Sequence, residues 1–197
     1  MINHLRPAIV LILLYTLLTG LALPVAMTGV VQTIFPHQAG GSLIERDGKV
    51  IGSALIGQNF TADKYFWSRP SATTDTDPND ATKTVPAPYN AGASSASNYG
   101  PTSKALIDRV QADVAKAGPA PVPGDAVTTS ASGLDPDISP ENAARQVARV
   151  ANARHLPEAD VRALLAAHTA TPWLGLIGQS RVNVLELNLA LDATAAH

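Results

Sequence analysis

The sequence predicts an α+β protein in which a single N-terminal transmembrane helix precedes one mixed, helix-richer domain outside the cytoplasm. Three observations support this prediction: a long uncharged apolar stretch near the start, later segments with apolar residues at helical spacing, and a short β-branched run bounded by glycines. The 197 residues suffice for one such helix and one modest globular domain, but not for two large domains.

The N-terminal segment has the composition of a membrane span. No charged residue occurs between Arg6 and Glu45, and residues 7–35 are dominated by Leu, Ile, Val and Ala. About 25 helical residues at roughly 1.5 Å each exceed the roughly 30 Å hydrocarbon core of a bilayer, so residues 7–35 are predicted to span it with some tilt. Pro24 removes one helical hydrogen bond and marks a position for a kink.

A cleaved secretory signal is the alternative interpretation of this leader. Gly20-Leu21-Ala22 has the small-x-small pattern of a cleavage site, and cleavage after Ala22 would release a soluble binding module. Apolar residues nevertheless continue as far as Ile34, where a signal peptide would already be polar. The leader is therefore predicted to be retained as a membrane anchor.

The charges that flank the span predict its orientation. His4 and Arg6 precede it, whereas no positive residue follows it before Arg46. The positive-inside rule then places residues 1–6 in the cytoplasm and residues 49–197 in the periplasm. Small residues four positions apart, which permit close packing on another helix, form two pairs in the span: Thr16 with Gly20, and Ala22 with Ala26.

The chain beyond the span begins with a predicted joint, residues 36–48, which contains Gly40-Gly41-Ser42. Residues 50–57 are β-branched and apolar between glycines, a pattern that predicts a strand or hairpin. Residues 68–101 are rich in Pro, Thr, Ser and Asn with almost no apolar periodicity, so a long irregular loop is expected. Core packing is favoured over a membrane-interface position for four clustered aromatic residues: Phe60, Tyr65, Phe66 and Trp67.

Helical spacing dominates the second half of the chain. Thr102 is expected to cap a helix that ends near Gly118. Ser139 is expected to cap a second helix, with Pro140 in its first position, and Pro157 begins a third. The apolar faces of the three helices are predicted as Leu106, Val110 and Val114; Ala143, Val147, Val150 and Ala151; and Val161, Leu164, Leu165 and His168.

Three further segments complete the second half. Residues 119–124 are predicted to be a stiff Pro-rich linker, and residues 125–137 a segment rich in Thr, Ser and Gly. Residues 182–191 are ambiguous, because their leucines alternate as in a strand while Asn183 and Glu186 have the spacing of a capping box. A helix is favoured for residues 182–191.

Composition and motif content exclude several classes of function. The formal net charge of −2 and the pI near 6.2 provide no basic field that would attract nucleic acid. Cysteine is absent, which excludes disulfides, thiolate metal sites and cysteine nucleophiles. No phosphate-binding loop, HExxH motif or GxSxG elbow occurs, and the five histidines are scattered singly, so no catalytic, cofactor or metal site is predicted.

Five polar residues are candidates for contacts with a partner or within loops: Gln58, Arg69, Ser71, Asn98 and Asp135. Asp135 and Asp137 flank Pro136 and are expected to stabilise a turn rather than form a catalytic carboxylate pair. The alternative function is a membrane-anchored enzyme acting on envelope material. Its candidate catalytic groups are Ser71, Ser94, Ser95 and Asp135, and no histidine lies near them in sequence to act as a base.

Seven strings carry a resemblance that covers nearly the whole chain. They are GSALIGQNF (52–60), YFWSRPSA (65–72), YNA (89–91), SNYGPTS (97–103), VTTSASGLDPDISP (127–140), QVARVANAR (146–154) and RVNVLELNLALD (181–192). In this order, after a single anchor, they resemble the KdpC family, the C subunits of the Kdp potassium-transporting P-type ATPase. The chain departs from that family at 93–97, which lacks the usual glycines, and at 179–180, which reads Gln-Ser instead of Glu-Pro. These departures concern local turns.

The resemblance implies a non-catalytic accessory subunit in a bacterial inner (plasma) membrane. The implied partners are a P-type ATPase subunit that hydrolyses ATP, a channel-like subunit that conducts potassium, a small membrane subunit, and the lipid bilayer. ATP and potassium are then used by the complex, while this chain itself binds no cofactor. The resemblance also implies that the chain stabilises assembly and acts as a catalytic chaperone that raises the ATP affinity of the ATPase subunit.

Overall fold

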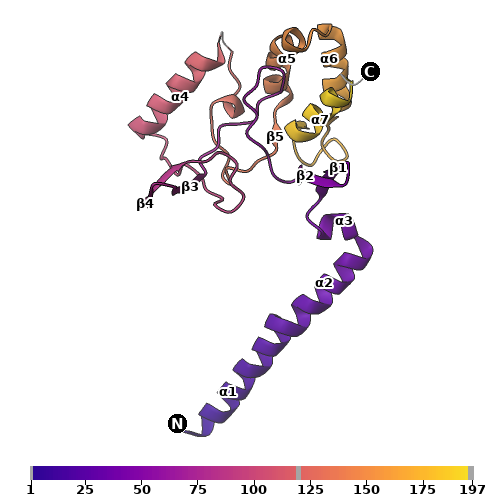
Figure 1. The fold of residues 1–197 in the computed structure, drawn as a ribbon. Coiled ribbons are helices and arrows are strands. Elements are labelled where there is room, and N and C mark those ends of the chain that lie inside the picture. Colours follow the sequence, from indigo (N-terminus) through magenta and orange to yellow (C-terminus); the bar gives the residue numbers. More distant parts are fainter. Residues whose placement is uncertain (1, 119–120, 195–197) are drawn as a thin grey trace. The chain divides into compact units, whose positions relative to one another are not determined.

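The computed structural model describes residues 2–118 and 121–194. The chain divides into two compact units, Met1–Ser53 and Ala54–His197, which are described separately. Figure 1 labels the helices and strands of both units. The mixture of helices and short strands after an apolar N-terminal helix confirms the predicted α+β class.

A long helical rod forms most of the first unit (Figure 1). It consists of α1 (Ile2–Leu17), a π-helical turn η1 (Leu18–Ala22) and α2 (Leu23–Ile34), which follow one another without a break. The 31 residues His4–Ile34 are long and apolar enough to cross a membrane, and none of the side chains in their most apolar window is buried within the chain. A helix that is apolar on all sides and buried on none is typical of a membrane span.

The π turn lies immediately before Pro24 in the chain. The N–H of Leu23 bonds to the carbonyl oxygen of Leu18, five residues earlier. Pro24 has no N–H to donate, and its ring crowds the carbonyl group four residues before it. The disturbance that Pro24 predicts is therefore present, and it takes the form of a widened turn.

A short helix and a hairpin complete the first unit. After α3 (Pro36–Ala39), strands β1 (Leu43–Arg46) and β2 (Lys49–Ser53) pair antiparallel. The turn residues Asp47 and Gly48 have φ of 53° and 73°, as in a type I′ hairpin turn. The strand predicted within 50–57 is thus present up to Ser53, while residues 36–48 are more structured than the predicted joint because Asp47-Gly48 folds β1 back onto β2.

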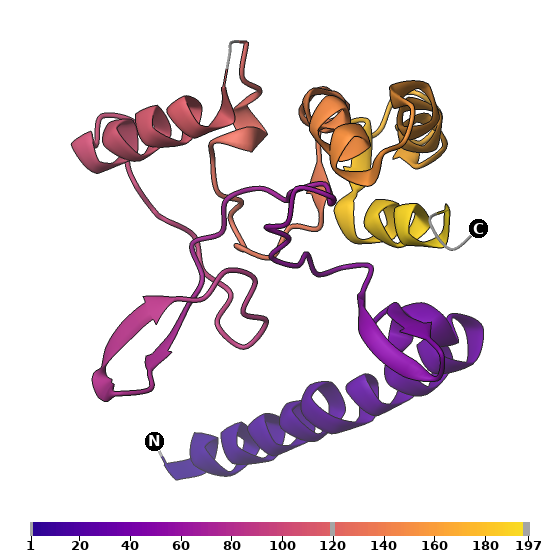
Figure 2. The same cartoon turned by 45° about the horizontal axis from the view of Figure 1, so that its top comes forward.

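Three helices, grouped at the upper right of Figure 2, and a small sheet form the buried core of the second unit. The helices are α5 (Pro140–Arg154), α6 (Glu158–Ala167) and α7 (Val184–Thr194). The antiparallel sheet has the order β5-β7-β6, from Asp137–Ile138, Arg181–Asn183 and Thr169–Ala170 respectively. Buried apolar side chains from these elements form one core: Ile138, Ala143, Val147, Val150, Ala151, Val161, Leu165, Val182, Val184, Leu187 and Leu191, joined by Phe66.

Helix α5 begins as its sequence predicts. The Oγ of Ser139 accepts from the N–H of Asn142 at 3.1 Å, and Pro140 occupies the first turn. The four residues predicted as its core face are at most 1% exposed. The helix ends at His155, whose φ of 56° is left-handed, and α6 follows with Pro157 as its N-cap. The prediction for α5 is confirmed, and so is the start of α6; of the face predicted for α6, Val161 and Leu165 are buried, Leu164 is partly buried, and His168 is the C-cap.

The ambiguous segment near the C-terminus contains both kinds of structure. Strand β7 ends at Asn183, and α7 starts at the next residue. The Oδ1 of Asn183 accepts from the N–H of Glu186 at 3.1 Å, so the capping spacing has the predicted effect. The helix favoured for residues 182–191 is confirmed from Val184 onward, and the alternating pattern reflects the short strand before it.

Helix α4 (Lys104–Ala117) differs from its prediction in two respects. It ends at Gly118, as expected, but its N-cap is Ser103 and not Thr102. None of its residues is buried, and the side chain of Val114 is 37% exposed. The predicted apolar face therefore does not reach the core that α5, α6 and α7 share, and α4 lies apart from these three helices, with a loop at each of its ends (Figure 1).

Residues 68–101 contain a hairpin where an irregular loop was expected. Strands β3 (Thr74–Asp77) and β4 (Asp80–Pro86) pair antiparallel. Their side chains are mostly polar, so the segment lacks the apolar alternation by which a half-buried strand is recognised. Residues 124–126, at the end of the predicted linker, form a 3-10 turn, η2 (Gly124–Ala126).

Candidate functional site

Three loop segments of the second unit meet at Ser71. The Oγ of Ser71 donates to the carbonyl oxygen of Gly133 at 2.7 Å and accepts from the N–H groups of Tyr89 at 3.1 Å and Thr73 at 3.3 Å. The Oγ1 of Thr73 donates to the carbonyl oxygen of Ala87 at 2.6 Å. We call this meeting point of segments 69–73, 87–90 and 130–135 the loop junction. Its hydroxyl groups replace the backbone ladder that these irregular segments lack.

An ion pair closes one side of the loop junction. Nη1 of Arg69 lies 2.9 Å from Oδ2 of Asp135, and Nη2 of Arg69 donates to the carbonyl oxygen of Thr129 at 3.3 Å. The Oδ1 of Asp135 accepts from the N–H of Asp137 at 3.0 Å. This bond across Pro136 confirms the predicted turn-stabilising role of Asp135.

Tyr89 fills the space between this ion pair and Gly57. Its hydroxyl group donates to the carbonyl oxygen of Arg69 at 2.8 Å, and burial raises the pKa of Tyr89 to about 12. A Cβ atom at Gly57 would touch the ring of Tyr89 and would come within 2.8 Å of the carbonyl oxygen of Asp135. Gly57 is therefore required by close packing, and Tyr89 remains neutral at physiological pH.

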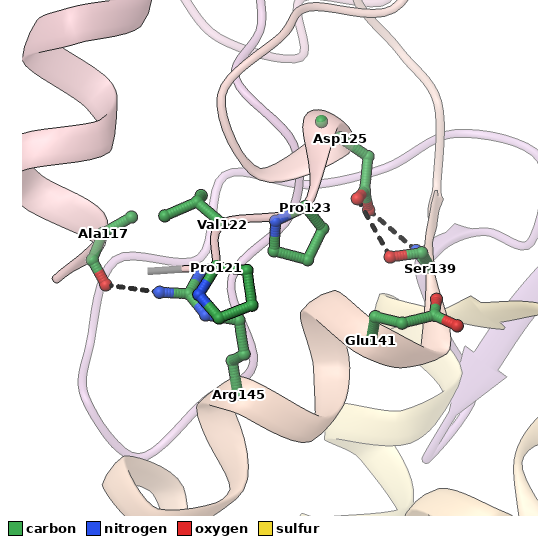
Figure 3. Close-up of a pocket in the computed structure, with 9 residues that line it drawn as sticks. Ala117, Pro121, Val122, Pro123, Asp125, Ser139, Glu141 and Arg145 are labelled. Atoms are coloured by element: carbon green, nitrogen blue, oxygen red, sulfur yellow. Dashed lines mark hydrogen bonds between the residues drawn. The ribbon is translucent and has the colours of Figure 1, made fainter. Parts of the chain in front are cut away.

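Asp125 connects the loop preceding α5 with the start of that helix (Figure 3). Its carboxylate accepts from the N–H and Oγ of Ser139 at 2.8 and 2.9 Å and from Nδ2 of Asn142 at 3.1 Å. Nearby, Nη2 of Arg145 donates to the carbonyl oxygen of Ala117 at 2.9 Å and so attaches the end of α4 to α5. The cavity between them, about 860 Å³, is bordered by prolines and these satisfied groups.

Two further contacts attach the aromatic segment to the helices. The amide of buried Asn188 accepts from the N–H of Phe66 at 2.8 Å and donates to its carbonyl oxygen at 2.9 Å. Arg154 pairs with Asp192 at 2.7 Å and also donates to the carbonyl oxygen of Lys64 at 2.6 Å. Phe66 is fully buried, which confirms the core packing predicted for it, whereas the side chain of Trp67 is 37% exposed.

The structure brings together only some of the candidate contact residues. Arg69, Ser71 and Asp135 meet in the loop junction, and the carbonyl oxygen of Gln58 accepts from the Oγ of neighbouring Ser68 at 3.1 Å. Asn98 has a φ of 52° and makes no side-chain hydrogen bond to another described residue. Sequence reasoning missed Thr73, Gly133 and Asn188, whose roles depend on segments distant in the chain. That any of the five candidates contacts a partner remains a prediction.

The serines of the alternative enzyme hypothesis have structural partners. Ser71 is fully engaged in the loop junction, and Ser94 donates to the carbonyl oxygen of Ser132 at 2.9 Å. No histidine of the described part of the chain hydrogen-bonds to Ser71, Ser94 or Ser95, so none of these hydroxyl groups has an imidazole base there.

Burial raises the pKa of Asp137, although Arg181 lies 3.1 Å from it and opposes the shift.

A short turn presents an exposed apolar surface. The N–H groups of Trp173 and Ile177 each bond to the other residue's carbonyl oxygen, at 3.0 and 3.1 Å. Leu174 and Gly175 between them have φ of 52° and 71°. Four side chains are left largely uncovered: Trp173 at 67%, Leu174 at 73%, Leu176 at 86% and Ile177 at 65% exposed. We call residues 172–178 the apolar tip, and clustered exposed apolar side chains of this kind mark interaction surfaces.

Within residues 2–118 and 121–194, one apolar helix is suited to a membrane and the domain after it has an uncovered apolar tip, features that indicate the class of membrane-associated proteins with an interaction surface. The chain belongs to the KdpC family: residues 5–193 match the family described as KdpC, K+-transporting ATPase, c chain.

Curated relatives agree with this assignment. The chain is 63% identical to the potassium-transporting ATPase KdpC subunit of Methylobacterium nodulans, over 99% of both chains. It is likewise 63% identical to that of Bradyrhizobium diazoefficiens over the full length of both, and 64% identical to that of Rhodopseudomonas palustris strain BisB18 over 98% and 99%. The resemblance noted in the sequence is confirmed, and the chain is a non-catalytic subunit of a K+-transporting ATPase complex.

Proposed function

We propose that this subunit stabilises assembly of the complex from the non-cytoplasmic side of the membrane, with its N-terminal helix as the anchor. The observation that carries the proposal is the apolar tip, because four clustered, largely exposed apolar side chains mark a surface that a partner covers. The proposed partners are a channel-like potassium subunit, a P-type ATPase subunit that performs the catalysis, and a small membrane subunit.

The proposed orientation has its own support in the flanking charges. Arg6 lies at one end of the candidate span, and Arg46 is the first Lys or Arg after the other end, while each end also carries one histidine, His4 or His37. We test it with protease added to intact spheroplasts. Digestion of residues beyond the span supports a periplasmic domain, and digestion that requires a broken inner membrane contradicts it.

The proposed location of the domain is above the outer mouth of the potassium pathway. Complexes that keep residues 1–53 but lack the second unit test this idea. A loss of potassium affinity or of assembly is the expected result. Unchanged affinity together with unchanged assembly would exclude both roles for the second unit.

The proposed chaperone activity raises the affinity of the ATPase subunit for ATP. A domain outside the membrane cannot touch a cytoplasmic nucleotide, so this effect has to be transmitted through the span and the partner subunits as a coupling free energy. Reciprocity then requires that ATP binding strengthen attachment of this subunit by the same factor. The test measures the affinity of this subunit for the detergent-solubilised complex with and without a non-hydrolysable ATP analogue. The ratio of these two affinities should equal the factor by which the subunit raises the affinity for ATP.

A further inference from the structure

The domain has a further surface feature besides the apolar tip, a recess beside α4. Two adjoining hollows, of about 970 and 430 Å³, lie against the side of α4 that carries Asp113 and Lys116, and both are also bordered by Trp67 and Pro70. We call them together the α4 groove. One end lies where Arg145 reaches the last turn of α4, as Figure 3 shows. Shared lining residues make the groove one extended depression.

The α4 groove is basic although the protein is not. Of the charged residues that line it, five are cations and one is an anion: Arg69, Arg109, Lys116, Arg145 and Arg149 against Asp113. The whole chain has 14 Lys and Arg against 16 Asp and Glu. Arg69 is already paired with Asp135, so the local excess is three positive charges, and on a chain of net charge −2 this excess indicates a site for negative charge.

Two of these guanidinium groups lack a carboxylate partner in the described part of the chain. Arg109 contacts only the ring of Tyr99, at 5.8 Å, and its Nε is buried without a hydrogen-bond acceptor. Arg149 donates to the carbonyl oxygens of Asp63 and Tyr65 and to Gln146, all neutral acceptors, and lies 3.7 Å from the centre of the Trp67 ring. Burial lowers the pKa of Arg149, and the nearby negative charge of Asp63 opposes this shift without forming an ion pair with the guanidinium group.

The walls of the groove favour a chain over a small anion. Trp67, Tyr99 and the prolines Pro70, Pro86 and Pro88 give it apolar and aromatic surface between the cations. Arg109, Asp113 and Lys116 stand at positions i, i+4 and i+7 of α4 and therefore follow one face along the groove. An extended peptide in which acidic and apolar side chains alternate would meet both features at once, whereas a single anion would meet one.

We infer that the α4 groove binds an acidic, extended segment of a partner subunit, with Arg109 as its principal ion-pair donor. The inference deepens the proposed assembly role and rests on it for the source of the segment. Lys104 provides a matched control on the same helix, because its side chain is 86% exposed, pairs with Asp108 and lies outside the groove.

The test begins with the full-length chain in mild detergent. A fluorescein-labelled octapeptide of alternating Glu and Tyr serves as the probe, and its Lys-Tyr counterpart as the charge control. We expect Arg109→Glu to weaken binding of the acidic probe at least about tenfold, and Lys104→Glu to change it less than about twofold. Circular dichroism verifies that both variants fold. Equal affinity in the wild type and both variants, or equal binding of the basic peptide, would overturn the inference.

A photo-crosslinking residue in place of Tyr99, in the assembled complex, then identifies the segment. Crosslinks to an acidic stretch of another subunit support the inference, and crosslinks confined to neutral or basic stretches overturn it. If the wild-type chain recovers no ATPase partner at all, the proposed assembly role fails. The peptide titration decides separately whether the groove itself binds acidic chains.

Discussion

The side-chain amide of Asn188 in α7 satisfies both backbone polar groups of Phe66, which comes from a loop 122 residues earlier in the chain. One planar amide thus replaces the strand that would otherwise pair with this segment. Because Phe66 is fully buried among the three helices, the same contact holds the aromatic segment and the C-terminal helix together.

Replacing Asn188 by Ala should destabilise the domain by about 2–4 kcal/mol. The substitution leaves the buried N–H and carbonyl oxygen of Phe66 without partners, and each unsatisfied group costs about 1–3 kcal/mol. Urea unfolding of the full-length protein in mild detergent, followed by circular dichroism, measures the loss. The control is Asn59→Ala, which also removes an asparagine side chain but lies outside the core. Its free energy of unfolding should stay within about 0.5 kcal/mol of the wild-type value. Equal effects of the two substitutions would contradict a central role for Asn188.

Gly133 and Gly175 make a matched pair for the loop junction. Their φ values are nearly the same, +69° and +71°, but a Cβ at Gly133 would lie 2.5 Å from the carbonyl oxygen of Ser95, whereas a Cβ at Gly175 would meet nothing within 4 Å. Gly175→Ala should cost about 1 kcal/mol, the price of left-handed backbone alone. Gly133→Ala should cost clearly more, because the backbone at Ser95 or at Gly133 has to move to make room for the added Cβ. Comparable unfolding midpoints for the two variants would show that the loop junction accommodates a Cβ at Gly133 at little cost in free energy.

The stability of the domain should depend on pH through Asp137. Burial raises the pKa of this carboxyl group above the unfolded value of 3.8, so the folded state binds its proton more readily. The associated stability is fully present below that value and is lost as pH rises through the folded-state pKa. Relative to Asp137→Asn, the wild type should therefore become less stable as the pH rises from 3.8 through the folded-state pKa of Asp137. Unfolding free energies of both proteins at several pH values check this, and a constant difference would refute it.

The apolar tip should matter for assembly and not for folding. Leu176 is 86% exposed, so Leu176→Asp should change the free energy of unfolding by less than about 0.5 kcal/mol. The same substitution should reduce recovery of the partner subunits when the complex is purified in mild detergent, since a charge would be buried in an apolar contact. Undiminished recovery would mean that the tip stays uncovered in the complex.

Local signals in the sequence predict the helical part of the fold well. Ser139 and Pro140 start α5, its apolar spacing identifies the buried face, and Gly118 ends α4. These features depend on neighbours within one helical turn, which a single sequence displays directly. The candidate membrane span is equally visible because its uncharged length exceeds that of ordinary core helices.

The missed elements depend on other kinds of information. The hairpin of β3 and β4 is polar on most positions, so no alternation marks it, and β1 was hidden although Asp47-Gly48 is a recognisable hairpin signal. In the site, Arg69, Ser71 and Asp135 were identified by residue type. Their partners Thr73, Gly133 and Thr129 are joined to them only by tertiary folding, which residue spacing does not report.

The π turn in the anchor has a consequence for its neighbours within the membrane. One additional residue in a helical turn rotates everything after it by about 100° around the helix axis. Thr16 and Ala22 are six residues apart, about 240° around a regular α-helix, and the π turn that contains Gly20 and Ala22 changes this angle to about 140° without aligning them, so the two small-residue pairs do not line up along one straight seam. A companion helix that fits closely against the first half is therefore directed away from the second. The rod therefore presents small residues on two separate sides, enough for two different transmembrane neighbours.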